Sequence, residues 1–339
     1  MKIIPIDKAV DEAVAALNRG ELVMFPTETV YGAGVGAHNA EAVKKLATYK
    51  QRPWGKPYAI MVADAEMAKK YVTLNKTAEN LYKNFLPGPL TVVSKSKQQT
   101  APGVESESGT LGVRIPDYLF MRKVISKLGR AIVATSANKS YEKRPYKIND
   151  VDTSKFDLVV DAGELPHNEP STVVDTTGDD EVVLRQGEIN LKGKNEIISR
   201  SEEETRNTGK ELWQKYAGYL GQRAIIFALE GPMGAGKTQL TKGIGKAMGI
   251  TEEIISPTFN LELTYGQLHH IDAWRMQEGT ELEELGMKGM ITDKAVMVVE
   301  WAEKVTEVIR KYNEEAVVVW VKIEYLAKEN ERKISWGNI

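Results

Sequence analysis

Short apolar runs alternate with amphipathic stretches along the first 190 residues of the chain. Residues 11–20 and 40–50 carry apolar side chains at helical spacing, and Gly20 stands where the first helix would end. Apolar segments of strand length occupy residues 21–27, 58–62, 90–95, 109–115, 131–135, 158–162, 171–175 and 181–187. This alternation predicts an α/β fold with a twisted mixed sheet and covering helices.

A second pattern of the same kind follows a polar, glycine-containing stretch at residues 190–195, which we interpret as a linker. Ser201 stands before three consecutive glutamates, the arrangement of a helix N-cap followed by an acidic first turn. The apolar run at 224–229 then predicts a buried strand. We therefore expect two domains, residues 1–192 and residues 193–339.

Composition limits the kinds of covalent link, metal site and cellular location to be expected of the chain. Its 339 residues include no cysteine, which excludes disulfides and thiolate metal sites. No apolar run approaches the roughly 18 residues that cross a membrane, and the first residues lack the apolar centre of a signal peptide. We expect a cytoplasmic protein without a membrane partner.

Charge is unevenly distributed, although the net charge is only −2. Residues 41–147 contain 20 lysines and arginines against 8 acidic residues, whereas residues 148–190 contain 2 against 11. Such blocks either form solvated faces or create a basic surface for phosphates or RNA. The charge pattern by itself leaves both interpretations open.

Residues 231–238, GPMGAGKT, match the phosphate-binding pattern G-x-x-x-x-G-K-[ST]. A predicted strand precedes this motif and an amphipathic helix follows it, which is the context that the motif requires. Backbone N–H groups at Gly234, Ala235 and Gly236 would surround the phosphates of ATP. Lys237 would reach the terminal phosphates, and Thr238 would bind Mg²⁺.

Further polar residues in the second domain suit an ATPase. Asp272 and Glu300 each end a predicted strand, so both are candidate catalytic acids, and Glu300 is also a candidate Mg²⁺ ligand. Thr258, on a proline-containing loop, is a candidate sensor of the terminal phosphate. Trp301, which follows Glu300, is included among the ATP-binding residues.

These segments together resemble the TsaE family of small P-loop ATPases. LEGPMGAGKT, SPTF, HIDAWR and VVEWAEK occur in that order, and the resemblance covers about residues 197–339. It implies a P-loop NTPase-like α/β domain that acts in bacterial tRNA threonylcarbamoylation beside a separate TsaD–TsaB transferase complex. Trp274 departs from the tyrosine usual in that family.

His269 and His270 would point to opposite faces of a strand, which favours structural roles over metal binding.

Several polar residues of the first domain follow predicted strands, at the edge where open α/β sheets bind ligands, or gather at a predicted helix end. They are Lys50, Arg52, Lys56, Arg114, Ser136, Asn138 and Arg185. Two prolines and a glycine lie in the loop that holds Arg52 and Lys56, and this rigidity favours anion binding over a solvated charge cluster.

With PTETVYG, PGPLT and STVVD, these residues resemble the YrdC/TsaC family of threonylcarbamoyl-AMP synthases over about residues 3–190. Its K-x-R and S-x-N pairs are matched by Lys50/Arg52 and Ser136/Asn138, the catalytic candidates. The family reaction combines L-threonine, bicarbonate or CO₂, and ATP, with Mg²⁺ on the phosphates and release of pyrophosphate. The substrate- and ATP-binding candidates are Thr27, Tyr31, Lys56, Arg114, Thr135, Ser171 and Arg185.

The segment FPTETVYGAG, residues 25–34, is expected to run from a strand end through a loop into a helix. Thr27 would offer its hydroxyl to a small polar substrate, whose polar groups a valine would leave unpaired. Glu28 would hold the metal or a cation. The reaction joins two anions, whose repulsion at about 4 Å is on the order of 4 kcal/mol at intermediate dielectric, so nearby cations must offset it.

Together the resemblances predict a natural fusion of two enzymes of one pathway, with tRNA contacted only indirectly or weakly. An alternative from another class is an RNA-binding module whose ATPase acts as a regulatory switch. A carbamoyl-transfer maturation factor with YrdC-like domains is a third possibility, but the zinc-finger cysteines of that family are absent from this sequence.

Overall fold

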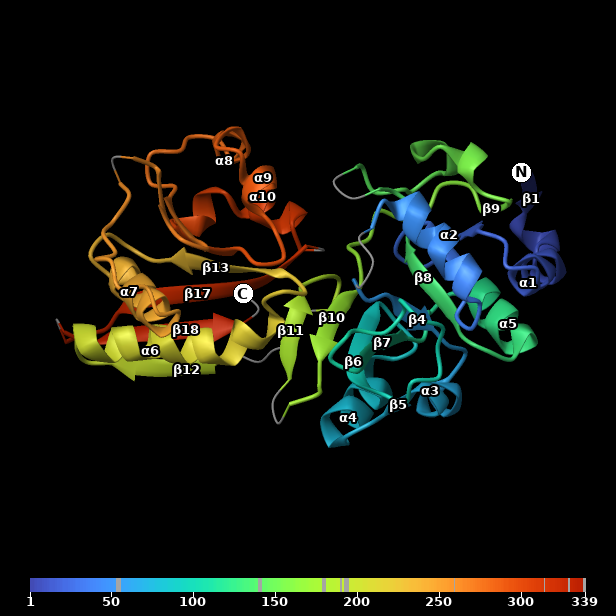
Figure 1. Cartoon of the computed structure of the whole chain (residues 1–339), viewed down its shortest axis with the longest axis horizontal. Coiled ribbons are helices and arrows are strands. Elements are labelled where there is room, and N and C mark those ends of the chain that lie inside the picture. Colours follow the sequence, from blue (N-terminus) through green and yellow to red (C-terminus); the bar gives the residue numbers. More distant parts are fainter. Residues whose placement is uncertain are drawn as a thin grey trace. The chain divides into compact units, whose positions relative to one another are not determined.

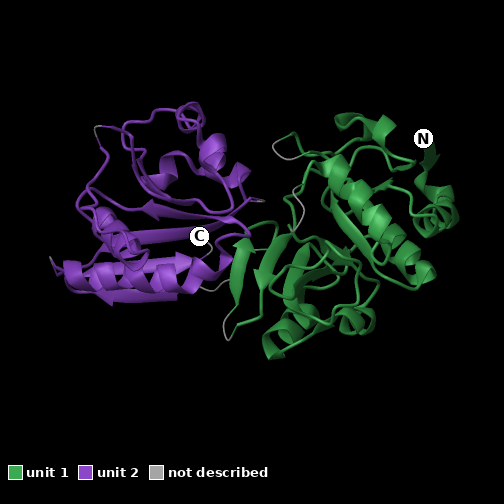
Figure 2. Ribbon diagram, in the orientation of Figure 1, with its two compact units in different colours: residues 1–190 green, residues 191–339 purple. Residues whose placement is uncertain are grey.

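The computed structural model describes residues 1–52, 56–139, 142–178, 181–189, 191, 195–258, 260–313, 315–328 and 330–337. The chain divides into two compact units, residues 1–190 and residues 191–339 (Figure 2). The predicted boundary between residues 192 and 193 and most of the predicted linker lie outside the described residues. The assignment of one enzyme to each side of that boundary therefore stays a prediction.

Unit 1 is built on a mixed sheet of eleven strands among its described residues. The strands are β1 (Lys2–Pro5), β2 (Val23–Phe25), β3 (Gly32–Gly36), β4 (Ala59–Met61), β5 (Val72–Thr73), β6 (Leu90–Ser96), β7 (Thr110–Arg114), β8 (Ile132–Ser136), β9 (Leu158–Asp161), β10 (Thr172–Asp175) and β11 (Val182–Arg185). Their order across the sheet is β1-β9-β2-β3-β8-β4-β7-β6-β10-β11, with β5 beside β6. Strand β9 thus separates β1 from β2, and it runs parallel to both.

Helices cover this sheet, and two of them bury one continuous core against it. The helices are α1 (Val10–Asn18), α2 (Ala40–Lys50), α3 (Ala65–Tyr71), α4 (Lys76–Phe85) and α5 (Leu119–Leu128). In Figure 1, α1 and α5 lie side by side, and their buried side chains, including Leu17 and Val124, meet Phe25 and Val160 of the sheet. The predicted helix at 40–50 is confirmed, with Asn39 as its N-cap.

The segment that follows Phe25 does not enter a helix, so that expectation was wrong. After a loop at 26–31 the chain continues as β3, which pairs antiparallel with β2. Gly32 and Gly34 allow this pairing. A Cβ at Gly32 would lie 2.6 Å from the Phe25 ring, and one at Gly34 would lie 2.7 Å from that ring and 2.5 Å from the carbonyl oxygen of Val133. The glycines therefore mark a close strand contact rather than a turn into a helix.

Unit 2 carries a seven-stranded mixed sheet among its described residues. Its strands are β12 (Asn195–Ser199), β13 (Ala224–Glu230), β14 (Glu262–Tyr265), β15 (Leu268–Asp272), β16 (Val296–Glu300), β17 (Ala316–Tyr325) and β18 (Arg332–Gly337). The order is β12-β18-β17-β13-β16-β15-β14, and β13 runs parallel to both of its neighbours. The α/β class is confirmed in both units.

The helices of unit 2 include a pair that packs unusually closely. They are α6 (Glu202–Tyr216), α7 (Lys237–Ala247), α8 (Thr280–Glu284), α9 (Met287–Met290) and α10 (Thr306–Lys311). Ser201 caps α6 as predicted, since its hydroxyl accepts the N–H of Glu204 at 3.1 Å. Helices α6 and α7 lie side by side in Figure 1, and a Cβ at Gly243 would lie only 1.9 Å from the carbonyl oxygen of Arg206. No helix in the described part of the chain is both long and apolar enough to span a bilayer.

Candidate active sites

The phosphate-binding motif forms the turn between β13 and α7. Gly231, Gly234 and Gly236 have φ angles of 144°, 72° and 109°, which side-chain-bearing residues rarely adopt. At Gly231 a Cβ would also lie 2.4 Å from the carbonyl oxygen of Ile323. The motif's glycines are therefore required by the backbone path, and the turn leads directly into the N-terminus of α7.

Lys237 is buried at the start of α7, with a side chain folded back over the turn. Its Nζ donates to the carbonyl oxygens of Gly231 at 2.6 Å and Pro232 at 3.0 Å. The same ammonium lies 3.8 Å from the centre of the Trp301 ring, a cation–π contact. Burial lowers the pKa of Lys237, while the charges of Glu300, Glu303 and Asp272 oppose that shift.

Two side chains form hydrogen bonds with one carboxylate oxygen of Glu300. Its Oε1 accepts the hydroxyl of Thr238 at 2.9 Å and lies 2.8 Å from Nε2 of His270. The side chain of His270 is fully buried, so the favoured structural role agrees with its position, but its direct contact with Glu300 was not foreseen. His269 is partly exposed and bonds Glu262 instead.

Asp272 lies beside Glu300, because β15 and β16 pair in parallel with these two residues in register. Its Oδ2 accepts the Thr258 hydroxyl at 2.8 Å, and its Oδ1 accepts the backbone N–H of Trp274 at 2.8 Å. The rings of Trp274 and Trp301 lie 4.4 Å apart, centre to centre. The predicted sensor loop is thus hydrogen-bonded to the predicted acid, although Phe259 of that loop lies outside the described residues.

These residues surround a pocket of about 650 Å³, within the range of small-molecule sites. Every predicted residue of the second site lines it: Gly234, Ala235, Gly236, Lys237, Thr238, Thr258, Asp272, Glu300 and Trp301. The pocket also includes residues that sequence reasoning missed: Arg200, Ser201, Glu202, Thr205, Gln239 and Arg332. Ser201 and Thr205 are four residues apart at the beginning of a helix, so they lie on one face of it. This spacing is the sequence feature that could have indicated their place in the pocket.

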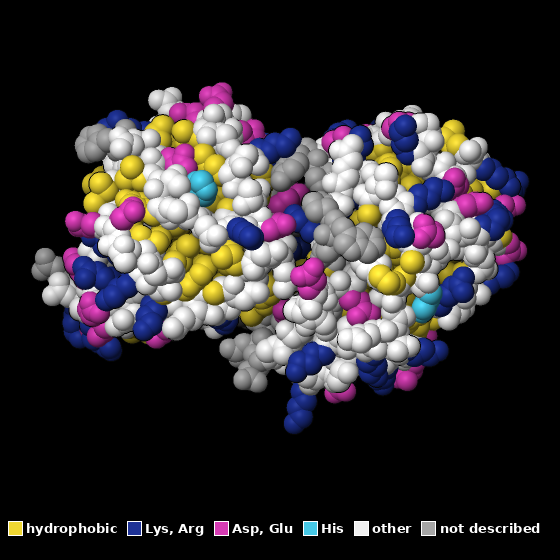
Figure 3. Space-filling view, viewed as in Figure 1, with side chains coloured by type: hydrophobic (Ala, Val, Ile, Leu, Met, Phe, Trp, Pro, Cys, Tyr) yellow, Lys and Arg dark blue, Asp and Glu magenta, His cyan; other side chains and the backbone are white. Residues whose placement is uncertain are grey.

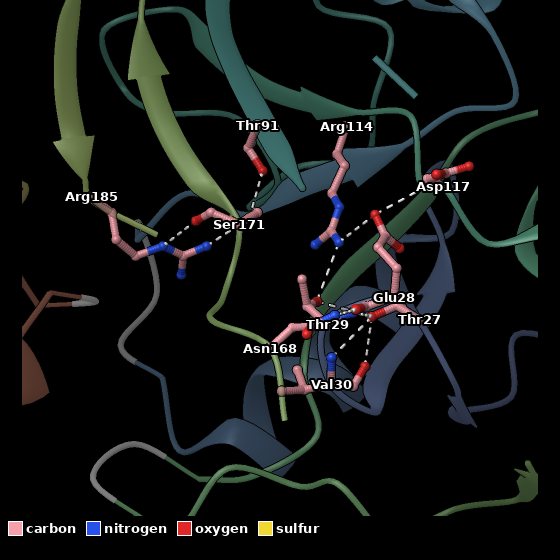
Figure 4. A network of polar contacts seen from close by, with 10 residues as sticks. All are labelled: Thr27, Glu28, Thr29, Val30, Thr91, Arg114, Asp117, Asn168, Ser171 and Arg185. Atoms are coloured by element: carbon pink, nitrogen blue, oxygen red, sulfur yellow. Dashed lines mark hydrogen bonds and ion pairs between the residues drawn. The ribbon is translucent and has the colours of Figure 1, made fainter. Parts of the chain in front are cut away.

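In unit 1, the loop after β2 is held by its own threonines (Figure 4). The Thr27 hydroxyl lies 2.6 Å from the carbonyl oxygen of Val30 and accepts the backbone N–H groups of Thr29 and Val30 at 3.2 Å each. It also lies 3.0 Å from the Thr29 hydroxyl. Thr27 is buried and shapes the loop; its predicted contact with substrate stays a prediction.

A largely buried ion pair joins this loop to β7. Oε1 of Glu28 lies 2.8 Å from the Arg114 guanidinium and accepts the N–H of Asp117 at 3.0 Å, while Oε2 is buried without a partner among the described atoms. Arg114 also donates to the Thr29 hydroxyl at 3.2 Å (Figure 4). The positive charge of Arg114, predicted to face an anionic substrate, is therefore already compensated by Glu28. Glu28 itself was expected to hold a metal or a cation.

A second polar cluster links β10 and β11. Arg185 donates through Nε to the carbonyl oxygen of Ser171 at 2.9 Å and through a terminal nitrogen to the Ser171 hydroxyl at 2.8 Å. That hydroxyl lies 3.1 Å from Thr91 of β6 (Figure 4). Ser171 and Arg185, both candidates for substrate or ATP binding, thus contact each other directly.

The K-x-R and S-x-N segments meet around a buried lysine. Nζ of Lys50 donates to the carbonyl oxygen of Ser136 at 3.0 Å and to that of Asn138. Asn138 Oδ1 is buried without a partner among the described atoms. Arg52 donates to the carbonyl oxygen of Pro57 at 2.6 Å. Residues 53–55 of the predicted rigid loop lie outside the described residues, whereas Lys56 is described and half-buried.

Two other predicted residues take up positions around the loop. The Tyr31 hydroxyl donates to the carbonyl oxygen of Gly163 at 2.8 Å and accepts the N–H of Ala162 at 2.9 Å. Burial raises the pKa of this phenol to about 12, so it remains a donor at neutral pH. Thr135 is on β8, one residue before Ser136 and in register with Ala33 of β3.

Many charges of the basic block are compensated. Lys45 pairs with Asp157, Lys69 pairs with Glu66, and Lys127 pairs with Asp11. On the face drawn in Figure 3, lysine and arginine side chains lie among acidic ones. For these residues the solvated interpretation holds, and a basic RNA surface gains no support from them.

The comparisons with known proteins agree with this arrangement. The family model Sua5_yciO_yrdC, described as "Telomere recombination", matches residues 15–187, about half of the chain. The chain belongs to the Sua5/YciO/YrdC family. A second model, "Threonylcarbamoyl adenosine biosynthesis protein TsaE", matches residues 199–334 of this Sua5/YciO/YrdC member. Both resemblances drawn from the motifs are confirmed.

Individual relatives extend the match. The threonylcarbamoyl-AMP synthase of Pyrococcus abyssi is 31% identical over 244 residues, which cover 69% of this chain and 72% of that protein. The threonylcarbamoyl-AMP synthase of Bacillus subtilis is 35% identical over 189 residues, 54% of each protein. A crystal structure of P. abyssi Sua5 complexed with L-threonine aligns with a TM-score of 0.56 and 22% identity over 94% of this chain and 99% of that one, which shows a shared fold.

Proposed function

We propose that the chain is a bifunctional enzyme of tRNA threonylcarbamoyladenosine biosynthesis. Unit 1 forms threonylcarbamoyl-AMP from L-threonine, bicarbonate or CO₂, and ATP. Unit 2 hydrolyses ATP to support turnover of a TsaD–TsaB-type transferase. The observation that carries the proposal is the presence, in one chain, of the Sua5/YciO/YrdC match and of a TsaE match whose phosphate-binding turn adjoins a pocket lined by Asp272 and Glu300.

In unit 1 the chemistry requires cations close to two anions. A carbamate oxygen of N-carboxythreonine attacks the α-phosphorus of ATP, a P–O bond forms, and pyrophosphate leaves. Lys50, fixed by two carbonyl oxygens, and Arg52, at the end of the same helix, are the proposed cations for these oxygens. Arg114 is paired with Glu28, so its proposed contribution is to hold the loop at Thr29.

In unit 2 the oxygen donors fit a hard divalent cation. The Thr238 hydroxyl, Glu300 and Asp272 line one pocket, and Mg²⁺ in proteins is commonly held by one or two carboxylates together with substrate phosphates. Bound Mg²⁺ would neutralise charge on the phosphates. Lys237 would exchange its two carbonyl contacts for phosphate oxygens, and the N–H groups of the turn would bind the remaining ones.

The synthase activity is tested by measuring threonine-dependent release of pyrophosphate from ATP in the presence of bicarbonate. Lys50→Ala and Arg52→Ala are expected to lower the rate at least 100-fold, because each removes a cation from the site. Lys44→Ala is the matched control, since Lys44 lies on the same helix but is exposed and pairs with Glu41. If the Lys50 and Arg52 variants retain near-normal rates, the synthase site lies elsewhere.

The role of unit 2 is tested in a reaction reconstituted with tRNA and a TsaD–TsaB complex. Lys237→Ala is expected to retain pyrophosphate release but to stop modification after about one round per transferase, because the terminal phosphates lose their point charge. Lys242→Ala, on the same helix but facing Glu253, is the control. Equal multiple-turnover yields for wild type and Lys237→Ala would show that turnover of the transferase does not require ATP hydrolysis by unit 2.

A further inference from the structure

His270 occupies a position that a core strand would ordinarily fill with an apolar side chain. Its strand, β15, lies between β16 and the edge strand β14 of the described sheet, and the His270 side chain is fully buried. Its Nε2 lies 2.8 Å from Oε1 of Glu300, whereas its Nδ1 has no partner in the part of the chain that the structure describes. A buried imidazole with one unpaired nitrogen is costly, so the contact of its other nitrogen with Glu300 needs an explanation.

Strand register brings the two side chains together. His270 is paired with Val298 in the parallel β15–β16 ladder, and Glu300 is two residues further along β16, on the same face of the sheet as Val298. The contact is thus a diagonal pair across two adjacent strands whose backbones are fixed by the sheet. His269 points to the opposite face and bonds Glu262 at 2.9 Å.

The shared oxygen fixes the direction of the Thr238 hydroxyl, which donates to Oε1 of Glu300. A carboxylate that serves as a metal ligand only accepts hydrogen bonds, so the inference assigns the imidazole proton of His270 to Nε2, which faces the same oxygen. Once the Thr238 proton points to Glu300, the lone pairs of its oxygen are directed away from that carboxylate, toward the pocket. Two donors on one oxygen also hold the carboxylate in a single orientation.

We propose that His270 is a positioning residue of the ATP site: its Nε2–H fixes the Glu300 carboxylate, which in turn orients the Thr238 hydroxyl for a divalent cation. This inference rests on the ATPase function proposed for unit 2. His270 itself does not touch nucleotide or metal in this assignment. Partners that orient a metal ligand in this way typically contribute 10- to 100-fold to metal affinity or activity.

The test compares His270→Gln, whose amide nitrogen reaches the place of Nε2, with His270→Leu, which has no donor. The matched control is His269→Gln, on the same strand but with its side chain on the other face. Two readouts are used on the full chain: kcat and KM for ATP hydrolysis, and the Mg²⁺ concentration at half-maximal binding of a fluorescent ATP analogue.

His270→Leu is expected to lower kcat and raise the half-maximal Mg²⁺ concentration, each about 10- to 100-fold, with KM for ATP changed less than threefold. His270→Gln is expected to restore both values to within about threefold of wild type, and His269→Gln to leave both unchanged. Equal values for His270→Leu and wild type would overturn the inference. A His270→Gln variant that is folded but does not recover the wild-type half-maximal Mg²⁺ concentration would also overturn it.

A third measurement does not depend on activity or on the folding of the leucine variant. In ¹⁵N-resolved NMR spectra of wild type, His270 is expected to be the Nε2–H tautomer, and Glu300→Gln is expected to shift that nitrogen while leaving His269 unaffected. An Nδ1–H tautomer would overturn the inference. If wild type neither binds nor hydrolyses ATP, the proposed function of unit 2 fails, whereas this NMR result still decides whether His270 holds Glu300.

Discussion

Replacing Glu28 by glutamine removes one charge from the buried pair with Arg114 and keeps the side chain's shape. At the 2.8 Å separation of the two groups, the Coulomb attraction is about 6 kcal/mol at intermediate dielectric. Desolvation of both ions offsets much of that attraction, yet removal of one partner from a buried pair typically costs about 3–5 kcal/mol, because the other charge stays buried. Glutamine still accepts the Asp117 N–H, so we expect a loss of about 3 kcal/mol.

For a unit of this size, a loss of about 3 kcal/mol corresponds to a fall in melting temperature of about 6–12 °C. Calorimetry would record the transition, and hydrogen–deuterium exchange of peptides from residues 1–190 would assign it to unit 1. Glu28→Gln combined with Arg114→Met is expected to be less destabilising than the sum of the single changes, because no unpaired charge remains. A change below about 0.5 kcal/mol for Glu28→Gln would refute the reasoning.

Three further predictions concern packing, pH and helix capping. Gly243→Ala is expected to lower the free energy of unfolding of unit 2, measured by urea titration, by about 3 kcal/mol, since its Cβ would lie 1.9 Å from the Arg206 carbonyl oxygen. Gly218→Ala is the control: a Cβ there would have open space, so the free energy of unfolding should not change. The pKa of Tyr31 is raised from 10.0 to about 12, so this phenol contributes stability that is complete below pH 10 and is lost as pH rises through 12. In urea titrations at pH 9 and pH 12, the free energy of unfolding should therefore fall less for Tyr31→Phe than for wild type. Ser201→Ala should cost about 1 kcal/mol in chemical denaturation, and Ser201→Asp should restore it.

Local signals in the sequence predicted the local features of the fold. The cap at Ser201 and the phosphate-binding motif depend on residues close in sequence, and both take the expected form. Strand β3 was missed because glycine disfavours strands, and only its contact with the ring of Phe25 explains Gly34 there. The strands β1, β5, β12, β14, β17 and β18 were also not predicted, and none of them carries a candidate motif.

The candidate sites were predictable by residue type but not by partner. Lys50 bonds to backbone carbonyl oxygens 86 and 88 residues away, and a carbonyl oxygen leaves no trace in residue identity. The pairing of Glu28 with Arg114 also depends on strands that meet only in the folded sheet. For His270 the sequence favoured a structural role over metal binding. Its contact with Glu300 follows from strand register, which the sequence does not display.

The strand orders have a consequence for how the chain acquires its structure during synthesis. In unit 1, β9 is the one described strand that pairs with β1, so β1 lacks this neighbour until about residue 161 has left the ribosome. In unit 2, β12 pairs with β18 and with no other described strand, from Asn195 opposite Trp336 to Ser199 opposite Arg332. Each sheet is therefore closed by a strand translated long after the one it covers, and pairings of such large sequence separation form slowly. A nascent chain that has exposed only the phosphate-binding turn and its flanking elements would still have an open sheet edge, which is where chaperones or aggregation act.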